Sequence, residues 1–377
     1  MVSAVGNARF TAWEFFAGGG MARAGLGDGW AVTFANDFDR LKGETYAANW
    51  GGEHLRVEDV WALTPEDLPG RADLAWASSP CQDFSLAGGR AGLGGGRSSA
   101  LLGFLDLMRR VEAEGRGPRT LVIENVVGLL SSNGGADFAG LCARLAADGW
   151  RFGAVEIDAA AFVPQSRPRL FMITARDAPP PERIGGPEQA SRAVREAVSR
   201  LSPHAAAAWL WWRLPAPAAR NADLASLLQP DAVWDAPERT ERLLSLLSPL
   251  HRARVEAALS RGERLVGTAY RRVRTESGRK VQRAELRFDG VAGCLRTPAG
   301  GSSRQLVVEI ADGRVRSRRL TAREGARLMG LADDYRLPAA ETAAWRVIGD
   351  GVAVPAVRRL AEAVLEPLLA PASRAAA

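Results

Sequence analysis

The sequence has little that would cross-link the chain, bind a metal or span a membrane. Only three cysteines occur among 377 residues, Cys81, Cys142 and Cys294, too few for a disulfide framework. The three histidines show no metal-ligand spacing with them. No apolar run reaches the roughly 18 residues that span a bilayer, and the start, MVSAVGNARF, lacks the features of a signal peptide. We therefore expect a soluble, metal-free monomer of a reducing cytoplasm.

Lysine is almost absent, since only Lys42 and Lys280 accompany the arginines. The net charge is +6, but residues 251–330 hold 19 basic and 8 acidic residues, whereas the remainder holds 30 and 35. This segregation predicts a polyanionic partner, nucleic acid above all. Arginine suits bidentate contacts to phosphate and guanine. A solvated basic face, or a GC-rich genome that favours arginine codons, would also explain the pattern.

Apolar runs that end in glycine or acid alternate with helix-like segments over residues 1–177. This alternation predicts an α/β domain whose parallel sheet is covered on both faces. Residues 178–315 are rich in proline and alanine and then in arginine, which predicts a smaller inserted domain with one helix over 238–262. Residues 316–377 are expected to return to the first domain. The cluster WLWW at 209–212 is expected to be core.

A glycine-rich turn, FFAGGGMARAG, follows the first expected strand. Its glycines would let the backbone approach a ligand. Arg23 stands where the third glycine of a dinucleotide fingerprint would fall, and no phosphate-loop lysine follows. Asp37 ends the second expected strand, where a carboxylate commonly binds ribose hydroxyls. These features predict a nucleoside cofactor without phosphates; an ordinary tight turn and a surface acid are the alternative.

Cys81 follows the apolar run ADLAWA, in the stretch SSPCQDFSLAG. Its sulfur would then lie at the carboxyl edge of the sheet, where ligands bind in open α/β sheets, and Pro80 would restrict the local backbone. A buried cysteine is more often a small core residue, as we expect of Cys142 on an apolar helical face. Cys81 is either such a residue or a nucleophile.

Three further features favour the nucleophile. Glu124 and Asn125 end another expected strand, at the same edge. Gln165, Arg167 and Arg169 alternate into a third strand and would share one face. Six glycines among residues 88–97 predict a loop that can close over a ligand.

Taken in order, these motifs resemble those of the cytosine-5 DNA methyltransferases. The resemblance covers nearly everything except residues 177–285, where family members differ because that domain reads the target sequence. Its seven motifs are FFAGGGMARAGL, NDFD, SSPCQDFSLAG, ENV at 124–126, QSRPR at 165–169, RLTAREGARLMG at 319–330 and GDGVAVP at 349–355.

The resemblance implies a Rossmann-like sheet, S-adenosylmethionine as methyl donor, and transfer to C5 of a cytosine flipped out of duplex DNA after Cys81 adds to C6. Glu124 would protonate N3. A restriction endonuclease is an expected partner. The catalytic candidates are Cys81, Glu124, Asn125, Arg167 and Arg169. The cofactor-binding candidates are Phe16, Gly18, Gly20, Asp37, Phe38, Asp59, Val60, Pro80, Asp350 and Val352. The expected DNA contacts are Gln82, Ser85, Arg97, Gln165, Arg271, Arg272, Arg274, Ser302 and Arg304.

Two related activities and one departure from the family pattern stay open. A transfer RNA cytosine-5 methyltransferase of the same fold would carry a Cys-Phe-Thr signature, which the sequence lacks. A non-catalytic DNA-binding homologue would be expected to lose Cys81 or Glu124. Asp350 stands where the family usually has asparagine; it either contacts the cofactor, faces solvent or caps the following helix.

Overall fold

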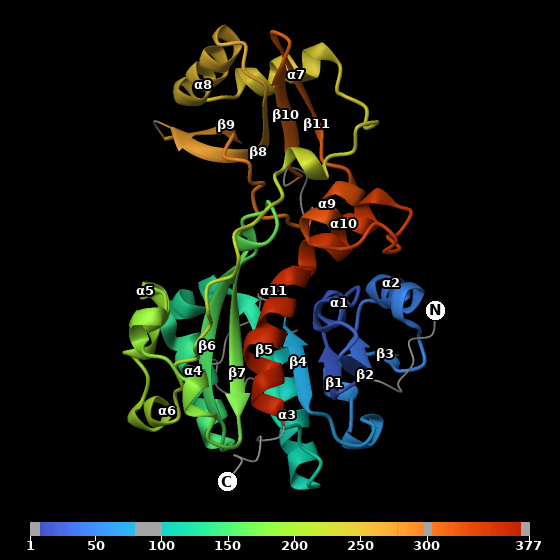
Figure 1. The fold of residues 1–377 in the computed structure, drawn as a ribbon, viewed down its shortest axis with the longest axis vertical. Coiled ribbons are helices and arrows are strands. Elements are labelled where there is room, and N and C mark those ends of the chain that lie inside the picture. Colours follow the sequence, from blue (N-terminus) through green and yellow to red (C-terminus); the bar gives the residue numbers. More distant parts are fainter. Residues whose placement is uncertain (1–7, 80–99, 277, 298–303, 371–377) are drawn as a thin grey trace. The chain divides into compact units, whose positions relative to one another are not determined.

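The computed structural model describes residues 8–79, 100–276, 278–297 and 304–370, which form two compact units (Figure 1). Unit 1 comprises Met1–Ile157, Pro168–Pro217 and Ala356–Ala377; unit 2 comprises Asp158–Arg167 and Ala218–Pro355. The predicted boundaries at 177/178 and 315/316 differ from these. Residues 178–217 belong to unit 1 because Trp209 packs beside Phe152 in its core, and residues 316–355 belong to unit 2.

Unit 1 is built on a sheet whose described strands follow the order β3-β2-β1-β4-β5-β7-β6. The strands are β1 (Phe10–Phe15), β2 (Trp30–Asp37), β3 (Leu55–Val57), β4 (Leu74–Ser78), β5 (Thr120–Val126), β6 (Arg151–Asp158) and β7 (Pro168–Ala175). The first five pair in parallel, and β4 is an apolar run buried on both faces, as parallel strands require. The predicted α/β fold is confirmed. However, β7 runs antiparallel to β5, because no crossover helix separates it from β6.

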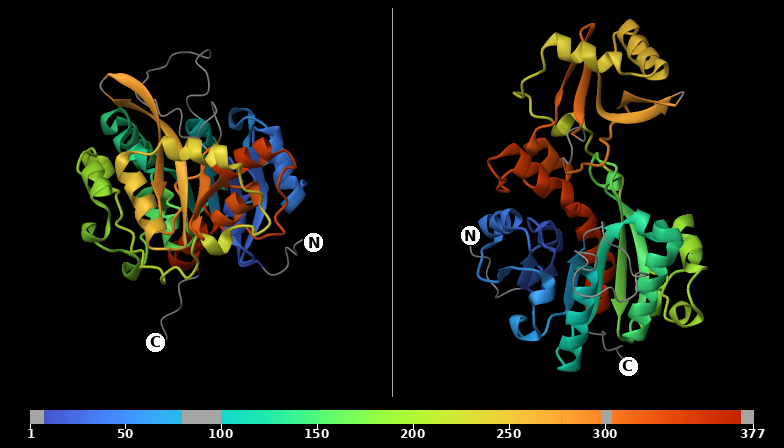
Figure 2. Two further views of the ribbon diagram at one scale, coloured as in Figure 1. Left: turned by 90° about the horizontal axis from the view of Figure 1, so that it is seen from above. Right: turned by 180° about the vertical axis from the view of Figure 1, so that it is seen from behind.

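Helices cover both faces of this sheet, with α3 and α11 on opposite sides (Figures 1 and 2). Asp39 starts α2 by accepting hydrogen bonds from two backbone N–H groups of its first turn. The helices are α1 (Met21–Leu26), α2 (Arg40–Trp50), α3 (Ala100–Ala113), α4 (Ala136–Ala147), α5 (Arg192–Val198), α6 (Pro203–Ala207), α11 (Val354–Leu360) and α12 (Glu366–Leu369).

The predicted core residues of unit 1 are confirmed. Trp209 and Trp212 are buried, and Trp211 packs against the same core. Cys142 on α4 is fully buried, and burial raises the pKa of its thiol. A thiol with a raised pKa is unreactive at neutral pH, so Cys142 is a structural residue.

Unit 2 contains an antiparallel sheet in the order β11-β10-β8-β9, with α7 and α8 packed against it. The single helix predicted over 238–262 is instead two helices, because Pro249 cannot continue α7 and begins α8, with Ser248 as its N-cap. The elements are β8 (Leu265–Glu276), β9 (Arg279–Arg287), β10 (Leu306–Ala311), β11 (Arg314–Arg319), α7 (Pro237–Ser245), α8 (Pro249–Ser260), α9 (Ala322–Leu328) and α10 (Glu341–Asp350).

Candidate active site

The glycine turn after β1 is held by the acid that ends β2. Asp37 accepts a hydrogen bond from Gly18 N at 2.8 Å and another from Asp39 N at 2.8 Å. Burial raises the pKa of the Asp37 carboxyl. Phe16 adopts a left-handed backbone with φ of 56°, which costs a non-glycine residue about 1–2 kcal/mol. Such strain concentrates at ligand sites.

Space and apolar surface lie beside this turn. A Cβ placed on Gly18 would meet no atom of the described residues within 4 Å, so among them the backbone is open to a ligand there. Phe38, Val57 and Trp61 are 59%, 45% and 51% exposed, and they are the exposed large hydrophobic residues of the described part of unit 1. Phe38 follows β2, Val57 ends β3 and Trp61 comes four residues later. Phe38 directly follows Asp37, so an aromatic residue and the predicted ribose-binding acid are neighbours at this edge.

Asp59 and Val60, the predicted adenine contacts, lie between Val57 and Trp61. Asp59 begins the 3-10 turn Val60–Ala62 by accepting a hydrogen bond from Trp61 N at 3.0 Å. The Val60 side chain is buried, so its backbone is the part left to meet a ligand. The residues present therefore fit an adenosine group. Sequence reasoning missed Trp61, whose only signal is an aromatic residue in a polar turn.

A buried acid that sequence reasoning also missed lies beneath the glycine turn. Glu14 on β1 is fully buried, and Oε1 accepts a hydrogen bond from Arg23 N at 3.3 Å. Burial raises the pKa of Glu14 to about 7. The Arg23 side chain lies against His54, and burial together with that guanidinium lowers the pKa of His54. An acid inside an apolar strand was the only sequence signal.

The raised pKa of Glu14 makes stability depend on pH. Between pH 4.5 and about 7 the folded chain keeps a proton that the unfolded chain has lost, so the free energy of unfolding falls as pH rises through this range. The variant Glu14→Gln has no carboxyl group at this position, so it cannot take up or lose this proton. The stability of wild type relative to the variant should decrease by up to about 3 kcal/mol between pH 4.5 and 8, measured by chemical denaturation. A difference independent of pH would contradict the prediction.

Glu124 and Arg169 form a buried ion pair at the carboxyl edge of β5. Arg169 Nε lies 3.1 Å from Glu124 Oε1, and the two side chains are 14% and 8% exposed. The antiparallel register pairs Glu124 with Phe171 and Val126 with Arg169, so the acid and the guanidinium are diagonal neighbours on one face. The ion pair holds the carboxylate in a fixed position.

Asn125, the residue after Glu124, forms hydrogen bonds to the residue directly after the neighbouring strand β4. Its Nδ2 donates to the backbone oxygen of Ser79 at 3.2 Å and to Ser79 Oγ at 3.1 Å. Ser78 pairs with Glu124 in the parallel ladder of β4 and β5. Ser79 directly precedes Pro80 and Cys81 in the chain. The predicted acid and the start of the predicted catalytic segment therefore meet at one edge of the sheet.

The alternation predicted that Gln165, Arg167 and Arg169 share one strand face. Gln165 and Arg167 do not share a face with Arg169, because β7 begins only at Pro168. They belong to unit 2. Gln165 is fully buried; its Nε2 donates to Leu328 O at 2.7 Å and its Oε1 accepts from Leu295 N at 3.1 Å. The structure therefore favours a positioning role for Gln165 over the predicted DNA contact.

Arg167 fastens three segments of unit 2 together. Its guanidinium is buried and donates to Leu295 O at 2.7 Å, Gly349 O at 2.8 Å and Gly351 O at 2.6 Å. Charged hydrogen bonds to backbone oxygens are strong and directional. This arrangement favours a structural role for Arg167 over the predicted catalytic one.

The last predicted cofactor residues also belong to unit 2. Asp350 ends α10, is exposed, and accepts a hydrogen bond from Thr297 Oγ1. Val352 is buried. Asp350 lies four residues before α11, too far to be its N-cap, and its contact with a cofactor stays a prediction.

Several predicted residues lie outside the described part of the chain. They are Pro80, Cys81, Gln82, Ser85, Arg97 and Ser302, together with the glycine-rich segment 88–97. Arg304 is described, and it pairs with Glu341 at 2.8 Å with its side chain 16% exposed. Its charge is therefore compensated within unit 2.

A family model for C-5 cytosine-specific DNA methylases matches residues 10–366. The chain belongs to this family. The methylase is 25% identical to type II methyltransferase M.HpaII of Haemophilus parainfluenzae, over 96% of its own length and 90% of that protein's. It is 24% identical to type II methyltransferase M.NlaX of Neisseria lactamica, over 96% and 98% of the two chains.

Solved structures show the same fold. The S. pombe Dnmt2 methyltransferase matches with a TM-score of 0.63 at 18% identity, over 96% of the methylase and 99% of that chain. A putative DNA modification methyltransferase from an E. coli prophage matches with a TM-score of 0.53 at 18% identity, over 96% and 99%. At this identity the likeness extends to the fold alone.

The predicted DNA-contacting arginines of the methylase lie on β8 but not on one surface. Arg272 and Arg274 are two residues apart and share one face of the strand. Arg271 lies on the other face, where it pairs in the ladder with the core residue Ala284 of β9. Arg271 is partly buried. Arg272 and Arg274 therefore remain the stronger candidates.

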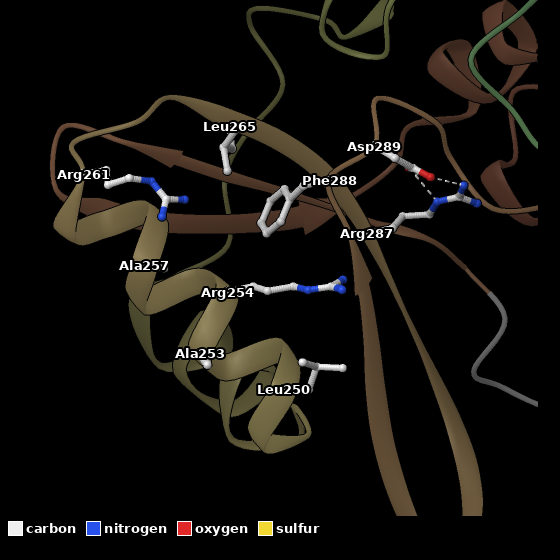
Figure 3. A pocket seen from close by; sticks show the side chains of 9 residues that line it. All are labelled: Leu250, Ala253, Arg254, Ala257, Arg261, Leu265, Arg287, Phe288 and Asp289. Carbon is white, nitrogen blue, oxygen red and sulfur yellow. Dashed lines mark hydrogen bonds and ion pairs between the residues drawn. The ribbon is translucent and has the colours of Figure 1, made fainter.

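A cavity of about 620 Å³ lies in unit 2 between α8 and the base of β8 and β9 (Figure 3). Arg287 and Asp289 form an ion pair at its rim. It is lined by Leu250, Ala253, Arg254, Ala257, Arg261, Leu265, Arg287, Phe288 and Asp289, none of which was predicted as a site residue.

Among the described residues of the methylase, no cluster of His, Cys, Asp and Glu side chains could hold a metal ion. No helix among them is long and apolar enough to cross a bilayer.

Proposed function

We propose that this methylase transfers a methyl group from S-adenosylmethionine to C5 of a cytosine flipped out of a specific duplex sequence, through a covalent bond between Cys81 and C6. One observation carries the proposal. Glu124, fixed by Arg169, lies beside the strand that leads through Ser79 into Pro80 and Cys81. This addition chemistry needs an acid close to a thiol, and the described residues bring Glu124 next to the segment that precedes Cys81 in the chain.

The residues of the chain divide the chemistry between them. The Cys81 thiolate would bond to C6 while Glu124, in its protonated form and with Oε1 still accepting from Arg169, donates a proton to N3, which makes C5 nucleophilic. Arg169 would hold Glu124 in place. After methylation, a water molecule would accept the C5 proton, the bond between sulfur and C6 would break to release the Cys81 thiolate, and the N3 proton would return to Glu124, which restores the aromatic ring.

The turn after β1 would hold the methyl donor. Asp37 would bind its ribose, Phe16 and Phe38 would pack on it, and Asp59 with the Val60 backbone would meet the adenine edge. The open space at Gly18 and the exposed apolar residues at this edge support that placement. S-adenosylmethionine supplies an electrophilic methyl group when bound. The type II names of the relatives support a restriction endonuclease as partner.

Methyl transfer tests the proposal directly. Purified chain incubated with tritiated S-adenosylmethionine should label duplex DNA, and bisulfite sequencing should place 5-methylcytosine within one short recurring sequence. Label found in transfer RNA and not in DNA would support the alternative activity of the same fold. Binding of DNA without any label would support the non-catalytic alternative.

A further inference from the structure

Strands β8 and β9 extend past the sheet of unit 2 as a two-stranded ribbon (Figure 1). Strand β10 pairs with β8 only from Leu265 to Ala269, whereas the β8–β9 ladder continues to Glu276. An isolated two-stranded hairpin is marginally stable in water. Its exposed half, which includes Val273 at 61% exposure, contributes little to the core. The ribbon is therefore a part of the fold that stability alone does not explain.

Arginines dominate one face of the ribbon. Arg272 lies directly opposite Arg283 in the register, and like charges in that position are destabilising. This face presents Tyr270, Arg272, Arg274 and Glu276 from β8, and Arg279, Val281, Arg283 and Glu285 from β9. A cluster that violates a local rule of sheet pairing is a candidate functional site.

Glu285 holds two of these arginines across the ribbon. It accepts hydrogen bonds from Arg272 Nη1 at 3.2 Å, from Arg274 Nη2 and from the Tyr270 hydroxyl. The Arg272 guanidinium also lies 5.6 Å from the centre of the Tyr270 ring. The Glu285 side chain is only 22% exposed, whereas Arg272 and Arg274 are 43% and 50% exposed. The carboxylate is therefore less exposed than the two arginine side chains that donate to it.

Glu276 holds Arg283 in the same way. Its carboxylate lies 2.7 Å from Arg283 Nε and 2.5 Å from Arg283 Nη2. The ribbon thus presents arginines whose side chains are already ordered. Ordering a long side chain before binding lowers the entropy lost when it meets a ligand, and a fixed guanidinium can present two parallel N–H donors to a planar acceptor pair.

We propose that Glu285 is a positioning residue that presents Arg272 and Arg274 to guanine in the major groove, so that the target contains a guanine read by this ribbon. The inference rests on the proposed function. A two-stranded ribbon fits the major groove, and arginine recognises the O6 and N7 atoms of guanine with two hydrogen bonds. An arginine that only neutralised phosphate would need no such fixed orientation.

Conservative variants distinguish the two kinds of contact. Arg272→Lys and Arg274→Lys keep the charge but lose the planar pair of donors. Binding is measured on duplexes with the mapped target, a scrambled sequence, and the target with 7-deazaguanine, which lacks N7. At least one lysine variant should lose about 5–150-fold in the ratio of target to scrambled affinity, with an unchanged salt slope. Wild type should bind the 7-deazaguanine duplex more weakly than the target duplex, whereas that lysine variant should bind the two duplexes equally.

Glu285→Gln tests the positioning role. It removes one negative charge without shortening the side chain, so scrambled-DNA affinity should stay equal or rise while the ratio falls at least about fivefold. Arg239→Lys is the matched control, because that arginine is exposed in unit 2 and paired with Asp235. The proposal would be overturned if all three ribbon variants kept the wild-type ratio of target to scrambled affinity. It would also be overturned if a lower melting temperature were their only change. Failure of wild type to methylate any DNA would instead overturn the proposed function.

Discussion

A duplex that carries 5-fluorocytosine at the target position should form a denaturant-stable complex with this methylase in the presence of the methyl donor. Fluorine at C5 cannot leave as a proton does, so the bond between Cys81 and C6 would persist. Cys81→Ala should form no complex and should transfer methyl groups no faster than a reaction without enzyme. Denaturing electrophoresis of labelled DNA measures the adduct.

The other cysteines provide controls for this experiment. Cys294 is partly exposed, and Cys294→Ala should form the adduct as wild type does. Unchanged DNA binding by Cys81→Ala would show that the variant is folded. An adduct that survives Cys81→Ala would identify a different nucleophile.

Arg167→Met should lower the free energy of unfolding by about 3–5 kcal/mol. The three oxygens of Leu295, Gly349 and Gly351 would lose their donor in a buried site, and hydrogen bonds to charged groups contribute about 1.5–3 kcal/mol each, though not additively. Chemical denaturation followed by tryptophan fluorescence measures the change.

Arg192 is the matched control for this substitution, because its side chain is 86% exposed and pairs with Glu196 in the next helical turn. Arg192→Met should change stability by less than about 0.5 kcal/mol. Equal stability of Arg167→Met and wild type would contradict the structural role of Arg167.

The sequence predicts the strands of unit 1 well because their ends carry strong local signals. Buried apolar runs such as Leu74–Ser78 have few alternative structures, and Asp37 and the glycine turn end neighbouring strands. The order of the family motifs then indicates which of these strand ends carry the predicted catalytic and cofactor-binding residues. The predicted closeness of Glu124 to the segment before Cys81 follows from this, since both lie at carboxyl ends of adjacent parallel strands.

Contacts between distant segments could not be predicted in the same way. The alternation of Gln165, Arg167 and Arg169 indicated one strand face, but the chain becomes a strand only at Pro168, where such alternation first applies. The partners of Arg167 lie more than 120 residues later in the chain. No local pattern indicates them. Likewise, nothing in the run RRVRT reveals that Glu285 lies across the ribbon from Tyr270.

The discontinuity of unit 1 has a consequence for how the chain folds during synthesis. Trp30 Nε1 donates to Glu366 at 3.1 Å, and Arg119 Nη1 donates to Leu369 O at 2.8 Å. The first strands therefore emerge from the ribosome more than 300 residues before the segment that completes their packing. Contacts between such distant residues close slowly, so unit 1 would remain incomplete while unit 2 is made. Nascent chains of this methylase should depend on chaperones until the last helices are released.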